Sequence, residues 1–395
     1  MTATSIVEDT SLKAIASRKE LFAAVQAVGH AVSGRSTLPI LSHIIVRADS
    51  NGLLLAATDL ELGISCRVKA QIQEIGAFTA PSKTLIEVLG NLPDKAEVAV
   101  SVDRSHTVRC QCERSDYKIL GLPAEEYPEL PEVQDAVSFL IPLQTLKEMI
   151  RCTIFAASTD ETRPILTGVL LSLEGDSLKM VATDTHRLAV ATVPILNGKG
   201  SQNSVVPARA LNELIRLLTD DEGSVHVSLS QNQICFSLPG ESQVQIISRL
   251  IEGQFPNFQR VIPQEHYKRL TVPTQPMLSA VRRASIIARD SSSAHRIVLH
   301  TKDNSLILTA ENPIVGSAYE ELEIIREGEE VEIAFNAAYL LDVLSIINEE
   351  AIALELTESL KPGMLKPVPD IGGKDNDASS RSLDYLCVLM PMQLL

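Results

Sequence analysis

The sequence lacks the features that mark membrane, secreted and zinc-binding proteins. It contains no apolar run of the ~18 residues that a membrane-spanning helix needs. The first twenty residues carry acids and no apolar segment, so they do not resemble a secretory signal. The six cysteines form no CxxC pair, which favours scattered, reduced thiols in the core of a cytoplasmic protein.

Sequence signatures of catalysis are also missing. There is no HExxH, GxSxG, GxGxxG or GxxxxGK[ST] segment, and the eight histidines do not cluster with cysteines. A candidate acid–base or metal-ligating pair is Asp184 and His186, beside Arg187. No further ligands stand nearby in the sequence, so a recognition surface or a turn stabilised by the aspartate is the favoured interpretation. We expect no catalytic residues, no cofactor and no metal.

Basic residues are fewer than acidic residues. Lysine and arginine number 35 against 50 aspartate and glutamate residues, which gives a formal net charge of −15. A tight electrostatic grip on nucleic acid is therefore not expected. The chain has 395 residues, of which 45% are apolar, enough for two or three domains of ~100–200 residues each.

The sequence does contain an internal repeat. The segment LPIL at 38–41 recurs as RPIL at 163–166, and ATD at 57–59 recurs at 182–184. Pro39 to Pro164 and Asp59 to Asp184 are both 125 positions apart. Between these anchors each copy contains two apolar strands joined by a glycine-containing turn, and a weaker third copy spans 295–322. These repeats indicate one structural unit written three times.

Each unit contains two helical segments among short strands. The first helices are predicted at 19–30, 143–157 and 275–288, and the second at 81–89, 207–215 and 336–344. Proline or asparagine at the start of the second segments suits a helix N-terminus, and the leucine spacing gives one buried stripe. Strands in runs, without strict βαβ alternation, are typical of α+β folds with antiparallel sheet.

The unit boundaries follow from proline-rich stretches near residues 134 and 263. We therefore predict domains at 1–134, 135–263 and 264–395. A polar stretch at 361–381, rich in proline, glycine and charged residues, is predicted to be a loop within the last domain.

Five motifs carry a family resemblance: TLPIL at 37–41, ATDLE at 57–61, VATDTHRLA at 181–189, GQFPNF at 253–258 and VLMPM at 388–392. Together they resemble the bacterial sliding clamp, the beta subunit of DNA polymerase III, and the similarity covers nearly the whole chain in order. The resemblance implies an α+β fold of three tandem DNA-clamp domains, each with two helices packed on antiparallel sheet. It also implies a head-to-tail homodimeric ring.

The implied function is that of a non-catalytic processivity factor in chromosome replication. The ring would encircle duplex DNA and tether the replicative DNA polymerase to it. Encirclement needs no tight grip on phosphates, so the negative net charge is compatible with it. The implied partners are duplex DNA, the DNA polymerase III alpha subunit, the clamp loader, other polymerases and repair proteins that carry clamp-binding peptides, and a second copy of the chain. No membrane is implied, and we expect a cytoplasmic location.

The resemblance also assigns residues to three surfaces. The partner-peptide pocket is matched by Leu166, Thr183, His186, Arg187, Leu188, Pro256, Arg260, Val261, Asn336, Tyr339, Val388, Met390, Pro391, Met392 and Leu394. The DNA-facing residues are Arg35, Lys83, Lys147, Arg151, Arg209, Arg282 and Arg283. The dimer interface is matched by Leu92, Tyr117, Ile119, Ile286 and Ile287.

The chain departs from the family pattern in two of these regions. Thr185 stands where the family usually has glycine, and Gln393 with Leu395 alters a common Arg-Leu ending; both changes are expected to shift partner preference. Asp160 and Glu161 lie in the loop 158–163, where acids disfavour close approach to DNA.

Two other classes of function remain open from sequence alone. One is an enzyme, a nuclease or transferase, with its site at Asp184 and His186, which a metal-dependent activity assay would reveal. The other is a repeat scaffold that binds proteins without encircling DNA. Such a scaffold could be monomeric, whereas three domains cannot close the ring alone. The basic helix residues and the methionines also admit ordinary structural roles, on solvated helix faces and in strand core.

Overall fold

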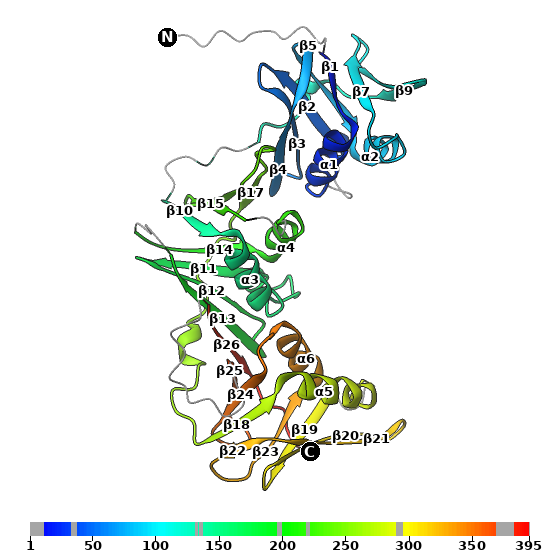
Figure 1. The fold of residues 1–395 in the computed structure, drawn as a ribbon. Helices are drawn as coiled ribbons and strands as arrows, with labels where there is room; N and C mark the ends of the chain where they lie inside the picture. Colours follow the sequence, from blue (N-terminus) through cyan, green and yellow to red (C-terminus); the bar gives the residue numbers. More distant parts are fainter. Residues whose placement is uncertain are drawn as a thin grey trace. The chain divides into compact units, whose positions relative to one another are not determined.

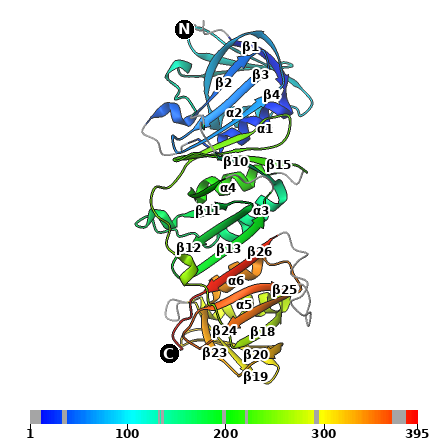
Figure 2. The same ribbon diagram turned by 90° about the vertical axis from the view of Figure 1, so that its left-hand side faces the viewer.

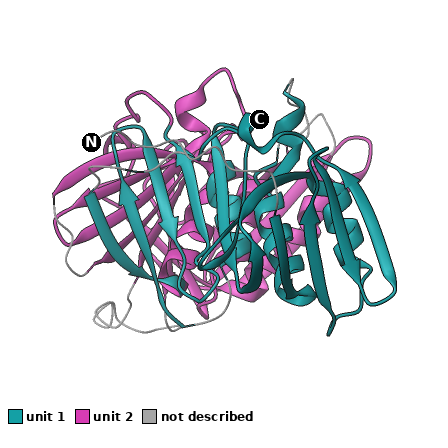
Figure 3. Cartoon of the chain, turned by 90° about the horizontal axis from the view of Figure 1, so that it is seen from above, with its two compact units in different colours: residues 1–143, 209–250 teal, residues 144–208, 251–395 magenta. Residues whose placement is uncertain are grey.

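The structure is a computed structural model that describes residues 12–32, 38–130, 133, 137–195, 200–218, 222–289, 295–368 and 383–394. Within these ranges it contains six α-helices and antiparallel strands arranged in four sheets (Figure 1). The α+β fold predicted from the strand and helix pattern is confirmed. The chain forms two compact units. Unit 1 consists of residues 1–143 and 209–250, and unit 2 of residues 144–208 and 251–395 (Figure 3).

Unit 1 contains two sheets. The larger has the strand order β10 (Val137–Pro142), β15 (Ser224–Leu229), β16 (Gln233–Ser237), β17 (Gln245–Arg249), β4 (Leu62–Val68), β3 (Gly52–Thr58), β2 (His43–Asp49) and β6 (Gly76–Pro81). The smaller has the order β5 (Ala70–Glu74), β1 (Leu12–Ser17), β7 (Glu97–Val102), β8 (Thr107–Cys112) and β9 (Ser115–Leu120). Helices α1 (Arg18–Gly29), α2 (Ser82–Gly90) and nearly all of α4 (Ala208–Leu217) belong to this unit.

Unit 2 also contains two sheets. The larger has the order β14 (Ser201–Pro207), β11 (Gly168–Glu174), β12 (Ser177–Thr183), β13 (Arg187–Pro194), β26 (Asp384–Leu389), β25 (Gly363–Val368), β24 (Ala351–Leu356), β18 (Lys268–Pro273) and β22 (Ile325–Glu327). The smaller has the order β21 (Gly316–Glu323), β20 (Ser305–Asn312), β19 (Arg296–Lys302) and β23 (Glu332–Asn336). Helices α5 (Thr274–Ala288), α6 (Ala337–Ile346) and nearly all of α3 (Leu143–Ile154) belong here.

The threefold repeat is visible in the order of elements. Each repeat has a strand, a helix, a three-stranded meander, one further strand (second repeat) or two (first and third repeats), a second helix and three more strands. The meanders are β2–β3–β4, β11–β12–β13 and β19–β20–β21, and the closing strands are β9, β17 and β26. Strand β17 of the second repeat pairs with β4 of the first, and β26 of the third pairs with β13 of the second (Figure 2). The sheets therefore continue from one repeat into the next.

This continuity explains why the compact units differ from the sequence repeats. Strands β15–β17 of the second repeat complete a sheet of the first, while β11–β14 share a sheet with strands of the third. The second repeat is thus divided between the two units. The predicted domain boundaries near 134 and 263 follow the repeats and remain a prediction.

Turn residues set the strand ends in the first meander. Asp49 accepts a hydrogen bond from the Asn51 amide at 2.7 Å, and Gly52 adopts φ 123°. A Cβ at Gly52 would lie 2.4 Å from the Val68 carbonyl oxygen, so glycine is required there. The turn fixes the register in which Ile45 pairs with Ala56, and hence which side chains share each face of the sheet.

The predicted helices are present, and two sequence-based boundaries need correction. The helix predicted at 143–157 ends at Ile154. The loop predicted at 361–381 was wrong at its start, because Gly363–Val368 is strand β25, paired with β24 and β26. Most of the remaining stretch, from residue 369 onward, lies outside the described residues.

The six cysteines are free and buried, as predicted for core thiols. Burial raises the pKa of Cys66, Cys110, Cys152 and Cys387 to about 12. These thiols therefore stay protonated near neutral pH, and the thiolate is the reactive form.

Candidate functional site

The residues assigned to the partner-peptide pocket all lie in unit 2. The turn between β12 and β13 supplies several of them. Asp184 Oδ1 accepts hydrogen bonds from the amides of His186 at 2.9 Å and Arg187 at 3.0 Å. Thr183 Oγ1 donates to the Arg187 carbonyl at 2.7 Å. Asp184 therefore stabilises the turn, as the sequence favoured, and the turn presents His186 and Arg187.

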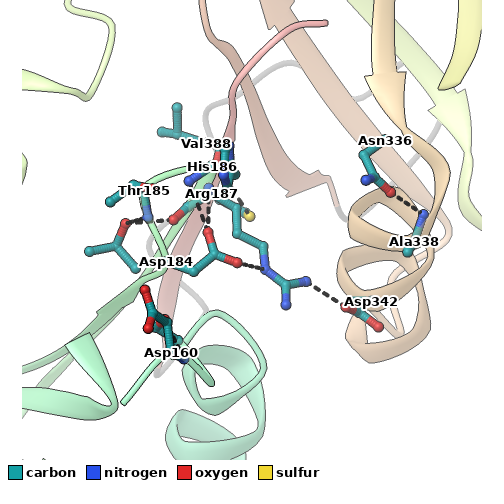
Figure 4. A network of polar contacts seen from close by, with 12 residues as sticks. Asp160, Asp184, Thr185, His186, Arg187, Asn336, Ala338, Asp342 and Val388 are labelled. Carbon is teal, nitrogen blue, oxygen red and sulfur yellow. Dashed lines mark hydrogen bonds and ion pairs between the residues drawn. The ribbon is translucent and has the colours of Figure 1, made fainter. Parts of the chain in front are cut away.

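Arg187 joins this turn to helix α6 (Figure 4). Its Nε lies 3.0 Å from Asp184 Oδ2, and its Nη1 lies 2.5 Å from Asp342 Oδ2 on α6. The guanidinium also lies 4.4 Å from the ring centroid of Tyr339 and 5.2 Å from that of Phe155. Only 10% of the Arg187 side chain is exposed. Two carboxylates and two aromatic faces therefore fix its orientation.

Tyr339 contributes a second contact to the same turn. Its ring stacks against His186 at a centroid distance of 6.2 Å and an interplanar angle of 21°. Burial, with the nearby Asp184 carboxylate, raises the pKa of Tyr339, so its hydroxyl stays protonated. Asn336 precedes α6, and its side chain accepts a hydrogen bond from the Ala338 amide at 2.9 Å. This cap orients the first turn of α6, where Tyr339 lies.

The end of β26 continues along the same surface. Leu188 pairs with Val388 across β13 and β26. The Met390 amide then donates to the His186 carbonyl at 2.8 Å, and the Met392 amide donates to the Ala334 carbonyl at 2.8 Å. The 390–392 segment is thereby held to the β12–β13 turn and to β23, with both methionine side chains partly buried.

An apolar cluster includes Val388, near the end of β26. Its buried members are Leu170, Val181, Leu188, Val190, Val205, Met364 and Val388, and partly buried residues packed against it include Phe255, Phe258 and Val261. Leu166 is also buried, whereas Pro256 and Arg260 are exposed. A cavity of about 620 Å³ adjoins the cluster and is lined by Arg260, Val261 and Met390 among others.

The structure thus brings most of the predicted set around one turn, one strand end and one helix. It also adds residues that sequence reasoning missed, namely Phe155 and Asp342, which contact Arg187. Asp342 lies one helical turn after Tyr339, so the spacing could have suggested it. Nothing in the sequence pointed to Phe155.

The predicted DNA-facing residues differ in their surroundings. Lys83, Arg151 and Arg282 are exposed, and Lys147 is partly buried. Arg209 forms an ion pair with Asp59, and Arg283 forms a bidentate pair with Glu320 at 2.7 and 2.5 Å. The hydrogen bond from Arg283 lowers the pKa of Glu320, so that carboxylate stays charged and offsets the arginine. Arg35 lies outside the described residues.

Some of the predicted interface residues are exposed and others are buried. Ile286 is 59% exposed and Tyr117 is 39% exposed, whereas Leu92 and Ile119 are buried within the chain. Leu120, at the end of β9, is 76% exposed and was not in the predicted set. The exposed large apolar side chains on strand β9 are therefore Tyr117 and Leu120.

Among the described residues, no group of three or more histidine, cysteine, aspartate or glutamate side chains is placed to hold a metal ion. None of the helices in the described ranges is long and apolar enough to cross a membrane.

Comparison with known proteins identifies the family to which this chain belongs. Three domain models of the DNA polymerase III beta subunit match in order: the N-terminal domain over residues 12–131, the central domain over 140–257 and the C-terminal domain over 259–376. The beta sliding clamp of Escherichia coli K12 is 33% identical over 384 residues, covering 97% of this chain and all of the relative. That of Synechocystis is 34% identical over 381 residues, covering 90% and 96%.

Solved structures of sliding clamps also match this chain. The sliding clamp of Bacillus subtilis matches with a TM-score of 0.89 at 28% identity, covering 98% of this chain and all of that one. The C. crescentus beta sliding clamp matches with a TM-score of 0.88 at 32% identity and the same coverage.

The repeated fold and these matches define a DNA clamp, a replication protein that acts as a processivity factor and is not an enzyme. More specifically, the chain belongs to the DNA polymerase III beta subunit family, the bacterial sliding clamps. The resemblance inferred from the motifs is confirmed, and the enzyme alternative is set aside.

Proposed function

We propose that two copies of this chain join head to tail into a closed ring around duplex DNA, and that the ring holds its partners through the pocket in unit 2. The observation that supports the ring is the pair of open sheet edges. Strand β9 ends the smaller sheet of unit 1, and β21 ends the smaller sheet of unit 2.

The repeat indicates what these edges pair with. The closing strand of the second repeat pairs with the meander of the first, and that of the third pairs with the meander of the second. By the same rule β21, the last meander strand, requires the closing strand of a first repeat. In a head-to-tail dimer that strand is β9 of the partner. An exposed edge strand that lacks its intended partner can pair with other chains and cause aggregation.

Side chains near the two edges support the same pairing. Ile286 and Ile287 lie on α5, which packs against β20 and β21, and they offer an apolar surface next to one edge. Tyr117 and Leu120 are exposed on β9. Burial of these groups between copies would supply the apolar centre that a persistent interface needs.

The pocket proposal rests on the geometry around Arg187. The segment at 390–392 and the partly buried residues packed against the apolar cluster provide apolar surface, and methionine side chains adapt to different ligands. The partners proposed are the DNA polymerase III alpha subunit, the clamp loader and other polymerases or repair proteins with clamp-binding peptides. Solved clamps of Bartonella birtlesii and Pseudomonas aeruginosa are described as bound to griselimycin, so relatives of this chain bind a ligand.

Weak attraction to DNA fits this function. Two of the predicted DNA-facing arginines form ion pairs with acids, so these two are less available for phosphate contacts that would slow sliding. The tether acts by raising the effective concentration of polymerase at the primer end. We propose a cytoplasmic location, where replication proteins of bacteria work.

Topological linkage is the decisive test. The protein is loaded with a compatible clamp loader onto nicked circular DNA, and the retained fraction is measured before and after the circle is linearised. A ring is expected to slide off the ends and be lost rapidly. Equal retention on both forms would favour a scaffold that binds DNA or loader directly. Loading of the Escherichia coli clamp by the same clamp loader serves as the positive control.

A further inference from the structure

A second cavity, of about 730 Å³, lies in unit 1 on one face of the larger sheet. Its floor includes Ile45, Leu54, Ala56 and Ile247, and the segment Pro128–Leu130 forms one wall. Leu130 packs so closely over β4 that a Cβ at Gly63 would lie 2.5 Å from its methyl carbon. The volume falls within the range of ligand-binding pockets, ~300–1,000 Å³.

The strand register shows why this face is hollow. Ile45 pairs with Ala56, Ala56 with Ser65 and Ser65 with Gln245, so one cross-strand row spans β2, β3, β4 and β17. The row contains one large apolar side chain, two small ones and an amide.

The matching row of the second repeat is filled. At the 125-residue offset, Leu170, Val181 and Val190 replace Ile45, Ala56 and Ser65, and Leu386 pairs with Val190 as Gln245 pairs with Ser65. Together with Phe258, these residues form part of the apolar cluster of unit 2. Smaller and more polar side chains therefore leave space in the first repeat that larger ones occupy in the second.

Two arginines border the cavity. Arg67 is held in place by Asp49, since its Nη1 lies 2.8 Å from both carboxylate oxygens. Arg47 also lines the cavity, and its side chain has no hydrogen-bond or ion-pair partner within the described part of the chain. Glu129 is the acidic lining residue. Asp49 offsets the charge of Arg67, so the guanidinium of Arg47 is the group available for a carboxylate ligand.

We propose that this cavity is a second peptide-binding site, which takes an extended segment with an acidic side chain next to apolar ones. The carboxylate pairs with Arg47, and an apolar side chain enters the space above Ala56 and Ser65. Ser65 and Gln245 are positioned to bind peptide amides. The site shares no residue with the pocket of unit 2, so a test of this site is independent of the partner pocket proposed above.

The test uses the full-length protein with isotope-labelled isoleucine δ1 methyl groups, titrated with the peptide acetyl-Ala-Glu-Leu-Leu-Ala-amide. Saturable shifts of the Ile45 and Ile247 methyl resonances are expected. Arg47→Glu is expected to weaken binding at least about tenfold. The matched control is Arg114→Glu, an exposed arginine of the same unit, which should leave the affinity unchanged. Glu129→Gln removes the repelling acid and should strengthen binding.

The double variant Ala56→Val, Ser65→Val installs the side chains of the second repeat without changing charge. It is expected to fill the cavity and abolish the Ile45 and Ile247 shifts. Persistence of the shifts in this variant, or in Arg47→Glu, would overturn the proposal. So would shifts confined to Ile165 and Ile262 of unit 2, or equal affinity for N-acetylglutamate amide alone, which would show that only a carboxylate is bound.

Discussion

At the scale of single residues, Thr185 adopts a backbone conformation that disfavours its side chain. Its φ is 80°, and Leu60, at the matching position of the first repeat, has φ 77°. Both residues follow an aspartate whose side chain accepts two amide hydrogen bonds. The turn, and not the residue type, therefore imposes the left-handed conformation, at a strain of roughly 1–2 kcal/mol for a residue with a Cβ.

Thr185→Gly is expected to stabilise unit 2. Relief of strain exceeds the greater backbone entropy lost by glycine, so a gain of about 0.5–1 kcal/mol is expected. The measurement is the denaturant midpoint of the transition of unit 2. Thr159→Gly, at an exposed position with negative φ, is the control and should lower the midpoint. A lower midpoint for Thr185→Gly would mean that the threonine side chain makes a compensating contact.

Met390→Ala combined with Met392→Ala tests the pocket. The side chains are partly buried, while the segment is held by backbone hydrogen bonds, so truncation should remove apolar contact surface without releasing the strand. Affinity for a clamp-binding peptide of the polymerase alpha subunit is expected to fall by ~2 kcal/mol or more, roughly 30-fold. Fluorescence anisotropy gives the dissociation constant, and sedimentation checks that the oligomeric state is kept. Unchanged peptide affinity would place the pocket elsewhere.

At the scale of elements, helix α6 depends on its cap. Asn336 Oδ1 accepts from the Ala338 amide at 2.9 Å, and the stretch Ala337–Ile346 has no acid in its first turn to assist. Asn336→Ala is expected to cost about 1 kcal/mol and to speed hydrogen exchange of the Ala338 amide. Asn336→Asp keeps an acceptor and should restore protection. If both variants exchange alike, the cap does not stabilise this helix.

Strand β25 shows where composition misleads. Its sequence GMLKPV contains glycine, lysine and proline, which suggested a loop. In the fold it lies between β24 and β26, but β26 pairs only with Gly363, Met364 and Leu365. Pro367 lies beyond that pairing, so its missing amide hydrogen leaves no ladder bond unmade on that side. Burial of Met364 and Leu365 then decides the strand.

At the scale of the whole molecule, the prediction concerns assembly. Ile286→Asp places a charge in the proposed interface and is expected to raise the dimer dissociation constant by roughly 30-fold or more. Sedimentation equilibrium or light scattering measures the population of monomer. Ile75→Asp is the matched control, because Ile75 is similarly exposed and follows β5, which lies at the opposite edge of the smaller sheet from β9. A dimer of unaltered affinity in Ile286→Asp would exclude this interface.

The sequence by itself determined the three repeats, the helix and strand types and the family, because hydrophobic period, turn residues and motif spacing are local properties of the chain. It also assigned Arg187 and the 388–394 segment to one surface through family resemblance. Only the tertiary structure decided that Asp342 and Phe155 hold Arg187, that the second repeat divides between two compact units, and that a cavity remains above Ala56 and Ser65. Each of these depends on strand partners and side-chain volumes that come together from distant parts of the chain, and no local pattern records those pairings.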